Sequence, residues 1–259
     1  MSVFYYHNNQ VIAPWATDSK KKTNWLLIGG AVAALIGLVW WGYTWWLNHK
    51  IELATVVVCV DTDGDGKCDN RRGSGVIISP RGYILTTRDM VMADNGKAPA
   101  RKIEVIFESG EKSNHRLEAT LTAIGQPGAT ATTPRNNYAV LQVSTKTDLE
   151  YVELLDKRTY QREESVKSYG FPSADSAKSN DYGPQIKVLP GVLTSVNTSN
   201  DGGVTSLTQS SKLEEGMFGG PLIQGGKLAG INTQLGKPET VAIPMVLLLE
   251  DLKQYASAK

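Results

Sequence analysis

Hydrophobic and polar positions divide the chain into three stretches of different character. Residues 1–24 are polar with scattered aromatic side chains, and this composition does not predict a core. Residues 25–47 read WLLIGGAVAALIGLVWWGYTWWL and carry no charge. After them, short β-branched or alternating runs continue almost to the C-terminus. The pattern predicts a tail over 1–24, a long apolar helix over 25–47 and one larger strand-rich unit over 48–259.

The strand-like runs are separated by residues typical of turns, such as Pro80-Arg81-Gly82 and Gly225-Gly226. In chain order they are TVVVCV, SGVIIS, YILTT, KIEVIF, AVLQVS, KVLPGVLTSV, PLIQ and LAGINTQ. Many short strands with turn signals indicate an all-β sandwich or barrel. Only the segment PMVLLLEDLKQYA, near the C-terminus, has helical spacing of its apolar residues. We therefore expect an all-β unit that ends in a helix.

The apolar stretch 25–47 is long enough to cross a membrane, since a helix rises ~1.5 Å per residue and the hydrocarbon core is ~30 Å thick. A secretory signal peptide is the alternative, but its apolar region has only ~7–15 residues. Here the run is longer and ends in tryptophans, which are typical of a membrane interface: Trp40, Trp41, Trp45 and Trp46. We interpret the stretch as an uncleaved single-pass anchor.

Charges beside the span predict its orientation. Lys20, Lys21 and Lys22 precede it, whereas only His49 and Lys50 follow closely. The positive-inside rule then places the N-terminus in the cytoplasm and the larger unit in the periplasm, with the anchor in the inner membrane. Two pairs of small residues lie four apart in the span, Gly30 with Ala34 and Ala33 with Gly37, and such pairs let helices approach closely. Gly30, Ala34 and Gly37 are the candidate helix-packing residues. Ordinary lipid-facing composition explains the same pattern equally well.

Net charge and cysteine content add two constraints. The formal net charge is +1, so nothing indicates the basic surface that nucleic-acid binding needs. The two cysteines, Cys59 and Cys68, are close in sequence and could form a disulfide in an oxidising compartment. Two unpaired thiols remain the alternative, because sequence alone does not fix the geometry.

Several motifs in consistent order resemble the HtrA (Deg) branch of the trypsin-like serine proteases. They are GSGVIISPRGYILTT at 73–87, VLPGVLTSV, and GGKLAGINTQ followed by VAIPM. The resemblance implies a chymotrypsin-like double β-barrel with a C-terminal helix, preceded here by the single transmembrane helix, and an active cleft between the barrels. No PDZ-like segment follows the final helix in this sequence.

The resemblance also locates three catalytic positions, and each carries a different residue here. Asp89 stands where the family has its histidine, in TTRDMV, and Asn137 stands where it has its aspartate, in NYAVLQ. Phe218 replaces the serine in GMFGGP. A phenyl ring has no nucleophilic atom, and catalysis of this kind needs a nucleophile, a base and a residue that orients the base. We therefore expect no peptide hydrolysis at this cleft.

The retained Gly219-Gly220-Pro221 turn raises the question of why the loop persists. Small residues permit close backbone approach where two barrels meet, which is a structural reason to keep them. Phe218 would fill space that a substrate carbonyl needs. Neutral decay of an unused site and a cleft adapted to a partner both remain open from the sequence.

An acidic loop predicts a calcium site. Residues 61–69 read DTDGDGKCD, with carboxylates at alternating positions and glycine at the sixth, as in the loops of EF-hands and thrombospondin type 3 repeats that it resembles. The expected ligands are Asp61, Asp63, Asp65, the carbonyl of Lys67, and Asp69. Arg72 stands at the twelfth position instead of a bidentate acid, so the affinity should be modest. A plain polar connection between strands is the alternative.

These features favour a non-catalytic, single-pass membrane subunit whose protease-like domain is a scaffold in a larger membrane complex. Its expected partners are other subunits of that complex and the lipid bilayer, with no nucleic acid. A pseudoprotease that binds extended peptides in the old cleft is the alternative. An active hydrolase with unrecognised catalytic residues is the third reading.

Overall fold

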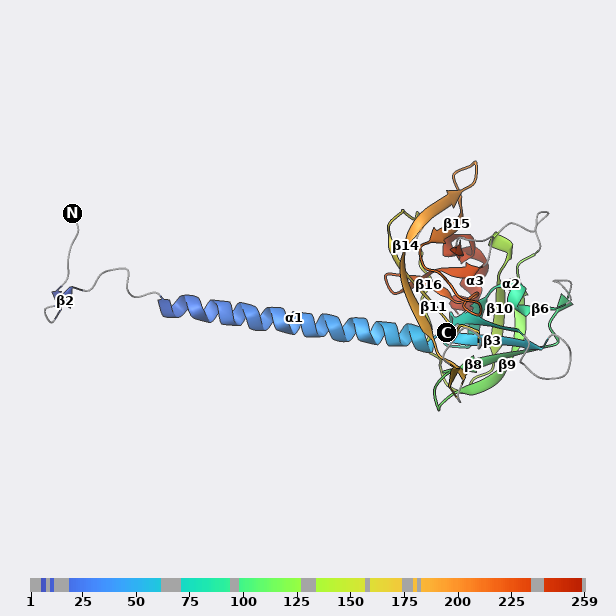
Figure 1. Ribbon diagram of the computed structural model, residues 1–259, viewed down its shortest axis with the longest axis horizontal. Coiled ribbons are helices and arrows are strands. Elements are labelled where there is room, and N and C mark those ends of the chain that lie inside the picture. The colour runs from blue at the N-terminus through green and yellow to red at the C-terminus, as the bar shows by residue number, and fades with distance from the viewer. Residues whose placement is uncertain are drawn as a thin grey trace. The chain divides into compact units, whose positions relative to one another are not determined.

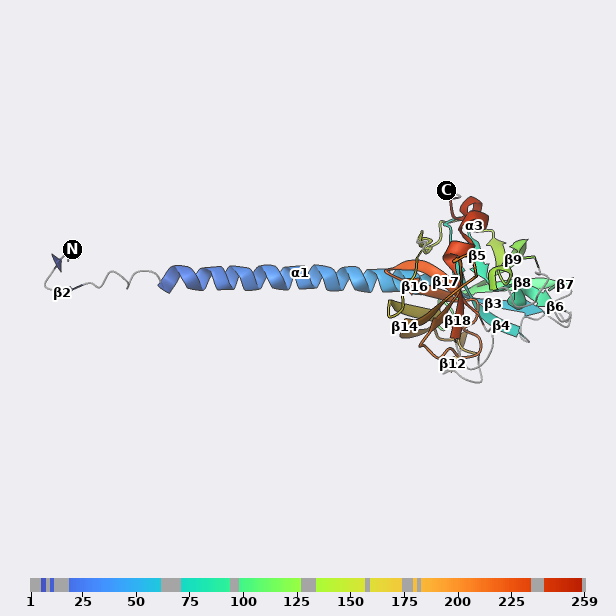
Figure 2. The ribbon, with the colours of Figure 1, turned by 90° about the horizontal axis from the view of Figure 1, so that it is seen from above.

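The chain divides into two compact units, residues 1–47 and 48–259, which we describe separately. The computed structural model (Figures 1 and 2) describes the following residues: 6–7, 10–11, 19–61, 71–93, 98–126, 134–156, 159–173, 179–180, 183–233 and 240–257.

Helix α1 (Ser19–Leu53) begins in the first unit and ends in the second. It is longer at both ends than the predicted span of 25–47. Its stretch Ile28–Leu53 is long and apolar enough to cross a membrane, a criterion that a signal sequence near the N-terminus also meets. Large apolar side chains of the first unit are exposed along it, including Leu35, Ile36, Val39, Trp40 and Trp41. Two short strands, β1 (Tyr6–His7) and β2 (Gln10–Val11), pair upstream of the helix.

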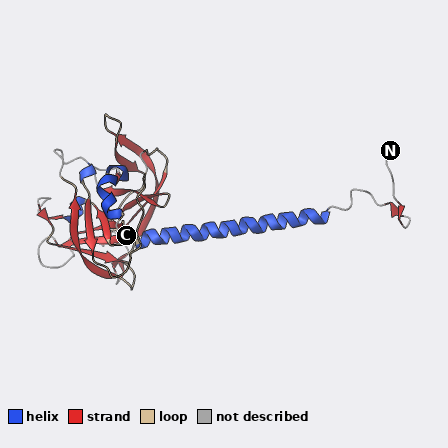
Figure 3. Ribbon diagram, turned by 180° about the vertical axis from the view of Figure 1, so that it is seen from behind, coloured by secondary structure: helices blue, strands red, loops and turns tan. Residues whose placement is uncertain are grey.

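The second unit contains two closed six-stranded barrels, and strands make up most of it (Figure 3). Barrel one has the strand order β10-β5-β4-β3-β8-β9. Its strands are β3 (Thr55–Asp61), β4 (Arg71–Ile77), β5 (Tyr83–Thr86), β8 (Lys102–Phe107), β9 (His115–Ile124) and β10 (Ala139–Val143). Every residue of β3 is buried, which is why this strand reads as a continuous hydrophobic run in the sequence.

Barrel two has the strand order β11-β14-β15-β18-β17-β16. Its strands are β11 (Ser165–Gly170), β14 (Lys187–Thr198), β15 (Val204–Gln209), β16 (Pro221–Gln224), β17 (Lys227–Thr233) and β18 (Thr240–Pro244). One buried cluster fills it, built around Val166, Leu193, Leu207, Leu222 and Ala242. The two barrels confirm the predicted all-β class and the double-barrel architecture.

Short elements complete the second unit. They are α2 (Arg88–Val91), the pair β6 (Met92–Ala93) and β7 (Ala98–Pro99), the pair β12 (Ser179–Asn180) and β13 (Gly183–Pro184), and the 3₁₀ turns η2 (Pro134–Asn136) and η3 (Met245–Leu247).

The expected C-terminal helix is present as α3 (Leu249–Ala256). It follows barrel two in the chain but contacts barrel one. Tyr138 donates a hydrogen bond to Asp251 at 3.3 Å, and the rings of Tyr83 and Tyr255 lie 5.2 Å apart. The helix therefore ties the end of the chain to the first barrel.

The last residues of α1 pack against the barrels within the second unit. Asn48 accepts hydrogen bonds from the Lys167 ammonium and the Tyr169 hydroxyl, at 3.0 and 3.2 Å. Ile51 is buried. Burial, and then the charge of Glu52, raise the pKa of Tyr169 to about 12, so its hydroxyl remains a hydrogen-bond donor at neutral pH. The end of the helix is thus part of the fold of the barrel unit.

Candidate functional site

Asp89 and Asn137, which occupy two of the three expected catalytic positions, lie in direct contact. The Asn137 amide donates to the Asp89 carboxylate at 2.7 Å, and its oxygen accepts from the Asp89 backbone N–H at 3.1 Å. Asp89 comes from α2 and Asn137 from the segment between η2 and β10. The fold therefore brings together the two residues that the sequence motifs assign to this site.

Thr233, at the end of β17, completes this cluster, and no sequence motif predicts its role. Its hydroxyl accepts a hydrogen bond from the Asn137 amide at 3.0 Å. Thr233 is buried, Asn137 is half-buried and Asp89 is exposed. Because Thr233 belongs to barrel two and the other residues to barrel one, the cluster links the two barrels. We call Asp89, Asn137 and Thr233 the Asp–Asn–Thr cluster.

Phe218 occupies the third position on the loop before β16, and its side chain is only partly buried. Its carbonyl accepts a hydrogen bond from the Ser74 N–H at 2.8 Å. Among the described residues, none accepts a hydrogen bond from the backbone N–H of Gly216 or Phe218. The loop thus places a phenyl ring and two unpaired donors at the position where the family carries its nucleophile.

The turn after Phe218 requires glycine for steric reasons. Gly219 has a φ of +86°, and a Cβ there would lie 2.2 Å from the Ser74 carbonyl oxygen. A Cβ on Gly220 would lie 2.3 Å from the Tyr169 carbonyl oxygen. Both contacts are far shorter than van der Waals distance. Glycine is therefore required at Gly219, where the backbones of the two barrels meet, and at Gly220, where the loop lies against β11 of barrel two.

Ser74, in the middle of the Gly-Ser-Gly motif, is the residue around which this junction is built. Its hydroxyl donates to the Gly216 carbonyl at 2.8 Å and accepts from the Phe171 N–H at 2.9 Å. Its own carbonyl accepts from the Thr86 hydroxyl at 2.8 Å. The Gly-Ser-Gly motif is evident in the sequence but does not predict these contacts of Ser74, because the partners are distant in the chain.

A buried polar network supports the same loop from inside barrel two. Asn232 accepts from the Gln209 amide at 2.8 Å and donates to the Pro221 carbonyl at 3.2 Å. Ser168 donates to Gln209 at 2.9 Å. The backbone of Asn232 also bonds to Gly219 and Gly220. Buried groups that are fully paired in this way fix a local conformation, so the loop carrying Phe218 is held on both sides.

Other candidate catalytic groups lie elsewhere. His115 begins β9 and its ring stacks on Phe107 at 4.9 Å, away from the Asp–Asn–Thr cluster in the fold of barrel one. The cluster itself offers a carboxylate, an amide and a hydroxyl, and Phe218 adds no nucleophilic atom. This set can hold a fixed hydrogen-bonded geometry, but it lacks an imidazole to carry a proton between substrate and enzyme.

The predicted calcium loop is only partly described. Asp61 is the last residue of β3, where it is buried and pairs in register with Lys102 on β8. Asp63, Asp65, Lys67 and Asp69 lie outside the described residues. No group of three or more metal-ligating side chains occurs within the part of the chain that the structure describes. Calcium binding therefore remains a prediction.

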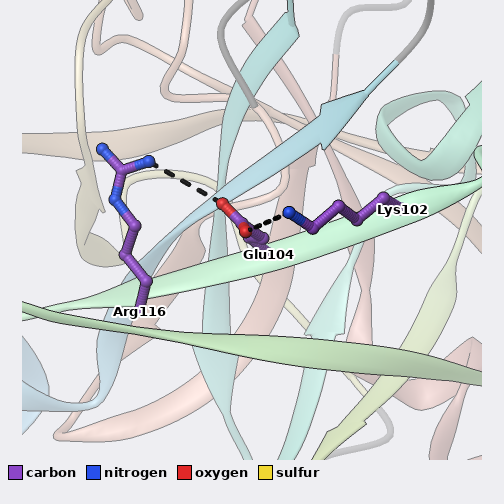
Figure 4. A network of polar contacts seen from close by, with 3 residues as sticks. All are labelled: Lys102, Glu104 and Arg116. Atoms are coloured by element: carbon purple, nitrogen blue, oxygen red, sulfur yellow. Dashed lines mark ion pairs between the residues drawn. The ribbon is translucent and has the colours of Figure 1, made fainter. Parts of the chain in front are cut away.

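Lys102 belongs to a surface charge network beside Asp61 (Figure 4). Its ammonium lies 2.8 Å from one Glu104 oxygen, and Arg116 approaches the other at 3.7 Å. The hydrogen bond and charge of Glu104 raise the pKa of Lys102, with smaller contributions from Glu118 and Asp61. One prospective calcium ligand therefore already has a cationic neighbour.

The remaining sequence predictions concern the cysteines and the span. Cys59 is buried in β3 and is disulfide-bonded, whereas Cys68, its expected partner, lies outside the described residues. On α1, Cβ atoms added to Gly30 or Gly37 would meet no other atom within 4 Å, and Ala34 is exposed. The small-residue face is thus uncovered among the described residues, and its role in helix packing remains a prediction.

Comparison with known proteins identifies the family. The family model described as a trypsin-like peptidase domain matches residues 73–231. A probable periplasmic serine endoprotease, DegP-like, from Pseudomonas savastanoi pv. phaseolicola is 31% identical over 180 residues. That alignment covers 66% of this chain and 32% of the relative, so the chain spans about a third of the length of this curated relative.

Solved structures similar to this one support the fold. Deg5 has a TM-score of 0.59 at 19% identity, with 79% of this chain and 89% of that chain covered. The serine endoprotease from Yersinia pestis has a TM-score of 0.58 at 23% identity, with 82% of this chain and 66% of that chain covered. The MamO protease domain from Magnetospirillum magneticum (apo form) has a TM-score of 0.56 at 21% identity, with 79% of this chain and 98% of that chain covered. The chain therefore belongs to the trypsin-like peptidase family, in the HtrA (Deg) branch that its motifs predict.

Proposed function

We propose that this chain is a non-catalytic, single-pass membrane subunit whose trypsin-like domain serves as a scaffold in a larger membrane complex. The observation that carries the proposal is the chemistry of the three catalytic positions, which hold Asp89, Asn137 and Phe218. Acyl transfer by this family needs an activated nucleophile and a base that accepts its proton. Neither group stands at this site, although the surrounding loop is kept.

The hydrogen bonds of the Asp–Asn–Thr cluster support a structural use of the old site. Asn137 bonds to Asp89 in barrel one and to Thr233 in barrel two. Bonds of this kind contribute about 1 kcal/mol each when both partners are satisfied, and more where one is charged. The substituted residues therefore stabilise the junction between the barrels, a role that suits a scaffold.

The exposed apolar helix supports membrane attachment. Within Ile28–Leu53, the 18-residue window that meets the criterion for crossing a membrane contains no buried residue. The side chains of that window therefore need another apolar environment. We assign the span to the inner membrane with the N-terminus in the cytoplasm, because three lysines precede it. The DegP-like relative is named as periplasmic, which agrees with a periplasmic barrel domain.

Binding of extended peptides in the old cleft is the second candidate function. The partial exposure of Phe218 favours it, because the ring is available to contact a ligand. The unpaired N–H groups of Gly216 and Phe218 could donate to a peptide carbonyl. In this second function the domain would bind a peptide without cleaving it. Both candidate functions therefore assume a non-catalytic cleft, and they differ in whether a peptide occupies it.

Two measurements on the full-length chain test the proposal. Purification from the native membrane in mild detergent should yield stoichiometric co-purifying subunits, identified by mass spectrometry. The same preparation should neither degrade unfolded casein nor react with a fluorophosphonate probe. Covalent labelling of the cleft would refute the non-catalytic assignment. A chain recovered alone, with peptides bound instead of subunits, would favour the second candidate.

A further inference from the structure

A cavity of about 560 Å³ lies in the barrel unit, apart from the Asp–Asn–Thr cluster. Three segments far apart in sequence form its walls. They are the end of α1 with His49, Glu52 and Leu53, the β8–β9 turn from Glu108 to Ser113, and the segment Gln185–Ile186 before β14. Its volume falls within the ~300–1,000 Å³ range of ligand-binding pockets.

The floor of this cavity is apolar and belongs to the core. Phe171 lines it and packs in a buried cluster with Val57 and Ile106, against which Ile186 also packs. Leu53 adds a third apolar side chain. Because the floor is part of a packed core, it presents a fixed apolar surface to whatever enters.

The rim is acidic. Glu52, Glu108 and Glu111 line the cavity, and none of the residues lining it is a lysine or an arginine. Glu52 and Glu108 are partly buried and Glu111 is exposed. Within the described parts of the chain, none of these three carboxylates forms an ion pair. Three carboxylates thus face a cavity whose lining contains no lysine or arginine, and His49 is the one imidazole among the lining residues.

Two walls of the cavity, the β8–β9 turn and the segment before β14, are held against each other. The Ser109 hydroxyl donates to the Pro184 carbonyl at 2.9 Å and is itself buried. A Cβ on Gly110, which has a φ of +89°, would come within 3.1 Å of Gln185. The turn therefore packs closely on the segment before β14, and contacts within the fold fix these two walls of the cavity.

From this arrangement we infer that the cavity binds an arginine or lysine side chain of an extended segment in a partner protein. The methylene stem would lie on the apolar floor of Phe171, Ile186 and Leu53, while the cationic head would meet the carboxylates of the rim. These carboxylates do not form a group that could hold a metal ion. A guanidinium suits such spacing better, since its donors fan outward and reach several separate acceptors.

This inference rests on the proposed function only in that a scaffold subunit needs a partner, and it names the chemistry of that partner. The inference about the cavity and the proposed function can be refuted independently of each other. Loss of binding at the cavity would leave the missing catalytic groups unaffected. Proteolytic activity in the old cleft would leave the cavity and its charge unaffected.

Peptide binding to the full-length chain in detergent micelles tests the inference. The probe is a fluorescent peptide, Gly-Leu-Arg-Leu, and its counterpart is the same peptide with citrulline, which keeps the shape of arginine but is neutral. We expect the arginine peptide to bind at least tenfold more tightly, as charge-assisted hydrogen bonds imply. We also expect its binding to weaken with added salt. Equal affinity for the two peptides, or no binding at millimolar concentration, would overturn the inference.

Variants then locate the binding site. Glu52→Gln with Glu108→Gln should weaken arginine-peptide binding about tenfold or more, because it removes two of the three charges. Glu111→Lys changes an exposed turn residue and supplies a competing cation, so it should have a similar effect. Glu118→Gln, an exposed change on β9 outside the cavity, is the matched control. Weakening by Glu118→Gln equal to that of the rim variants would also overturn the inference, as would unchanged binding in both rim variants. Tighter binding of ethanolamine phosphate than of the peptide would assign the cavity to lipid headgroups instead.

Discussion

Asn137 holds two of the three expected catalytic positions in contact through its side-chain amide. Its amide group makes three hydrogen bonds, to the Asp89 carboxylate, the Asp89 backbone and the Thr233 hydroxyl. An aspartate at this position could accept from Thr233 but could not donate to Asp89. Asparagine opposite aspartate is therefore a matched pair of hydrogen-bonding groups.

This retained geometry predicts what is needed to restore nucleophilic chemistry. Phe218→Ser alone should give no fluorophosphonate labelling above background, since no base lies beside the new hydroxyl. The triple variant Asp89→His, Asn137→Asp and Phe218→Ser should react with the fluorophosphonate probe. The side chains of Asp89 and Asn137 are already in hydrogen-bond contact, with the amide nitrogen 2.7 Å from the carboxylate oxygen, and Thr233 can donate to the new carboxylate. The base and its orienting group are worth roughly 10⁴-fold or more in rate in this chemistry.

The control for this experiment is the pair Asp89→His and Asn137→Asp with Phe218 unchanged. It should fold like the triple variant and remain unlabelled, since it has no nucleophile. Labelling of the single Phe218→Ser variant at the rate of the triple variant would show that another residue serves as the base.

At the scale of elements, Tyr160 connects the segment between the barrels to β17. It is buried, and its hydroxyl donates to the Ala229 carbonyl at 3.0 Å. Burial raises the pKa of Tyr160 to about 12, against an ordinary value of about 10. The folded state therefore holds this proton more tightly than the unfolded state does.

This shift predicts alkaline destabilisation with a definite sign. The contribution of Tyr160 to stability is complete below about pH 10 and is lost as the pH rises to about 12. The difference corresponds to roughly 3 kcal/mol. Tyr160→Phe should lower the free energy of unfolding by about 1 kcal/mol at neutral pH, because the hydrogen bond is missing. Between pH 10 and 12, however, the free energy of unfolding should fall less for this variant than for the wild type. Urea unfolding of both proteins across this range measures the slopes, and parallel slopes would contradict the assignment.

The connection between β3 and β4 gives the calcium prediction. Millimolar calcium should raise the melting temperature of the full-length chain over that in chelator, because a ligand at 100 times its dissociation constant stabilises by ~2.7 kcal/mol. Asp63→Ala with Asp65→Ala should remove the effect, whereas Asp201→Asn, in the exposed β14–β15 hairpin, should keep it. Identical melting of the wild type with and without calcium would show that 61–69 is a plain connection.

The strands that the sequence predicts are those with strong hydrophobic runs. β3 is buried along its whole length and β10 nearly so, and both are evident in the sequence. β9, β11 and β15 were not identified as strands. β9 has only one buried residue in ten, the others being exposed or half-buried. In β11 the exposed Ser165 and Lys167 lie on either side of the buried Val166. Such strands are recruited by their neighbours' hydrogen bonds, which leave no hydrophobic signal in the sequence.

The site shows a similar division. Motif spacing located Asp89, Asn137 and Phe218, and the structure brings the first two into contact. Ser74 and Thr233 were missed because their partners lie 142 and 96 positions away in the chain. The acidic cavity was missed for the same reason, since its walls come from three separate segments. Pairings of this kind follow from tertiary packing, which local patterns do not encode.

For the molecule as a whole, we expect both the span and the barrel unit to contribute to attachment in the membrane complex that we propose. A soluble contact and a membrane contact on the same chain reinforce each other, because the second forms at a high effective concentration. The helix offers the small-residue face of Gly30, Ala34 and Gly37 for close helix approach. The sequence before the helix contains Phe4, Tyr5, Tyr6 and Trp15, and we propose these aromatic residues as further contacts with a partner.

The last prediction tests that face directly. Gly30→Leu with Ala34→Leu keeps the span apolar, and added Cβ atoms at Gly30 meet nothing within the described chain, so the variant should insert and fold normally. It should nevertheless be lost from its complex on detergent extraction, because the larger side chains block close approach by a partner helix. Val32→Leu with Ile36→Leu, two positions on and hence roughly 200° around the helix, is the matched control and should be retained. If the Gly30/Ala34 variant co-purifies with unchanged stoichiometry, the span is an anchor alone and the barrel unit makes the attachment, with the acidic cavity as its candidate contact.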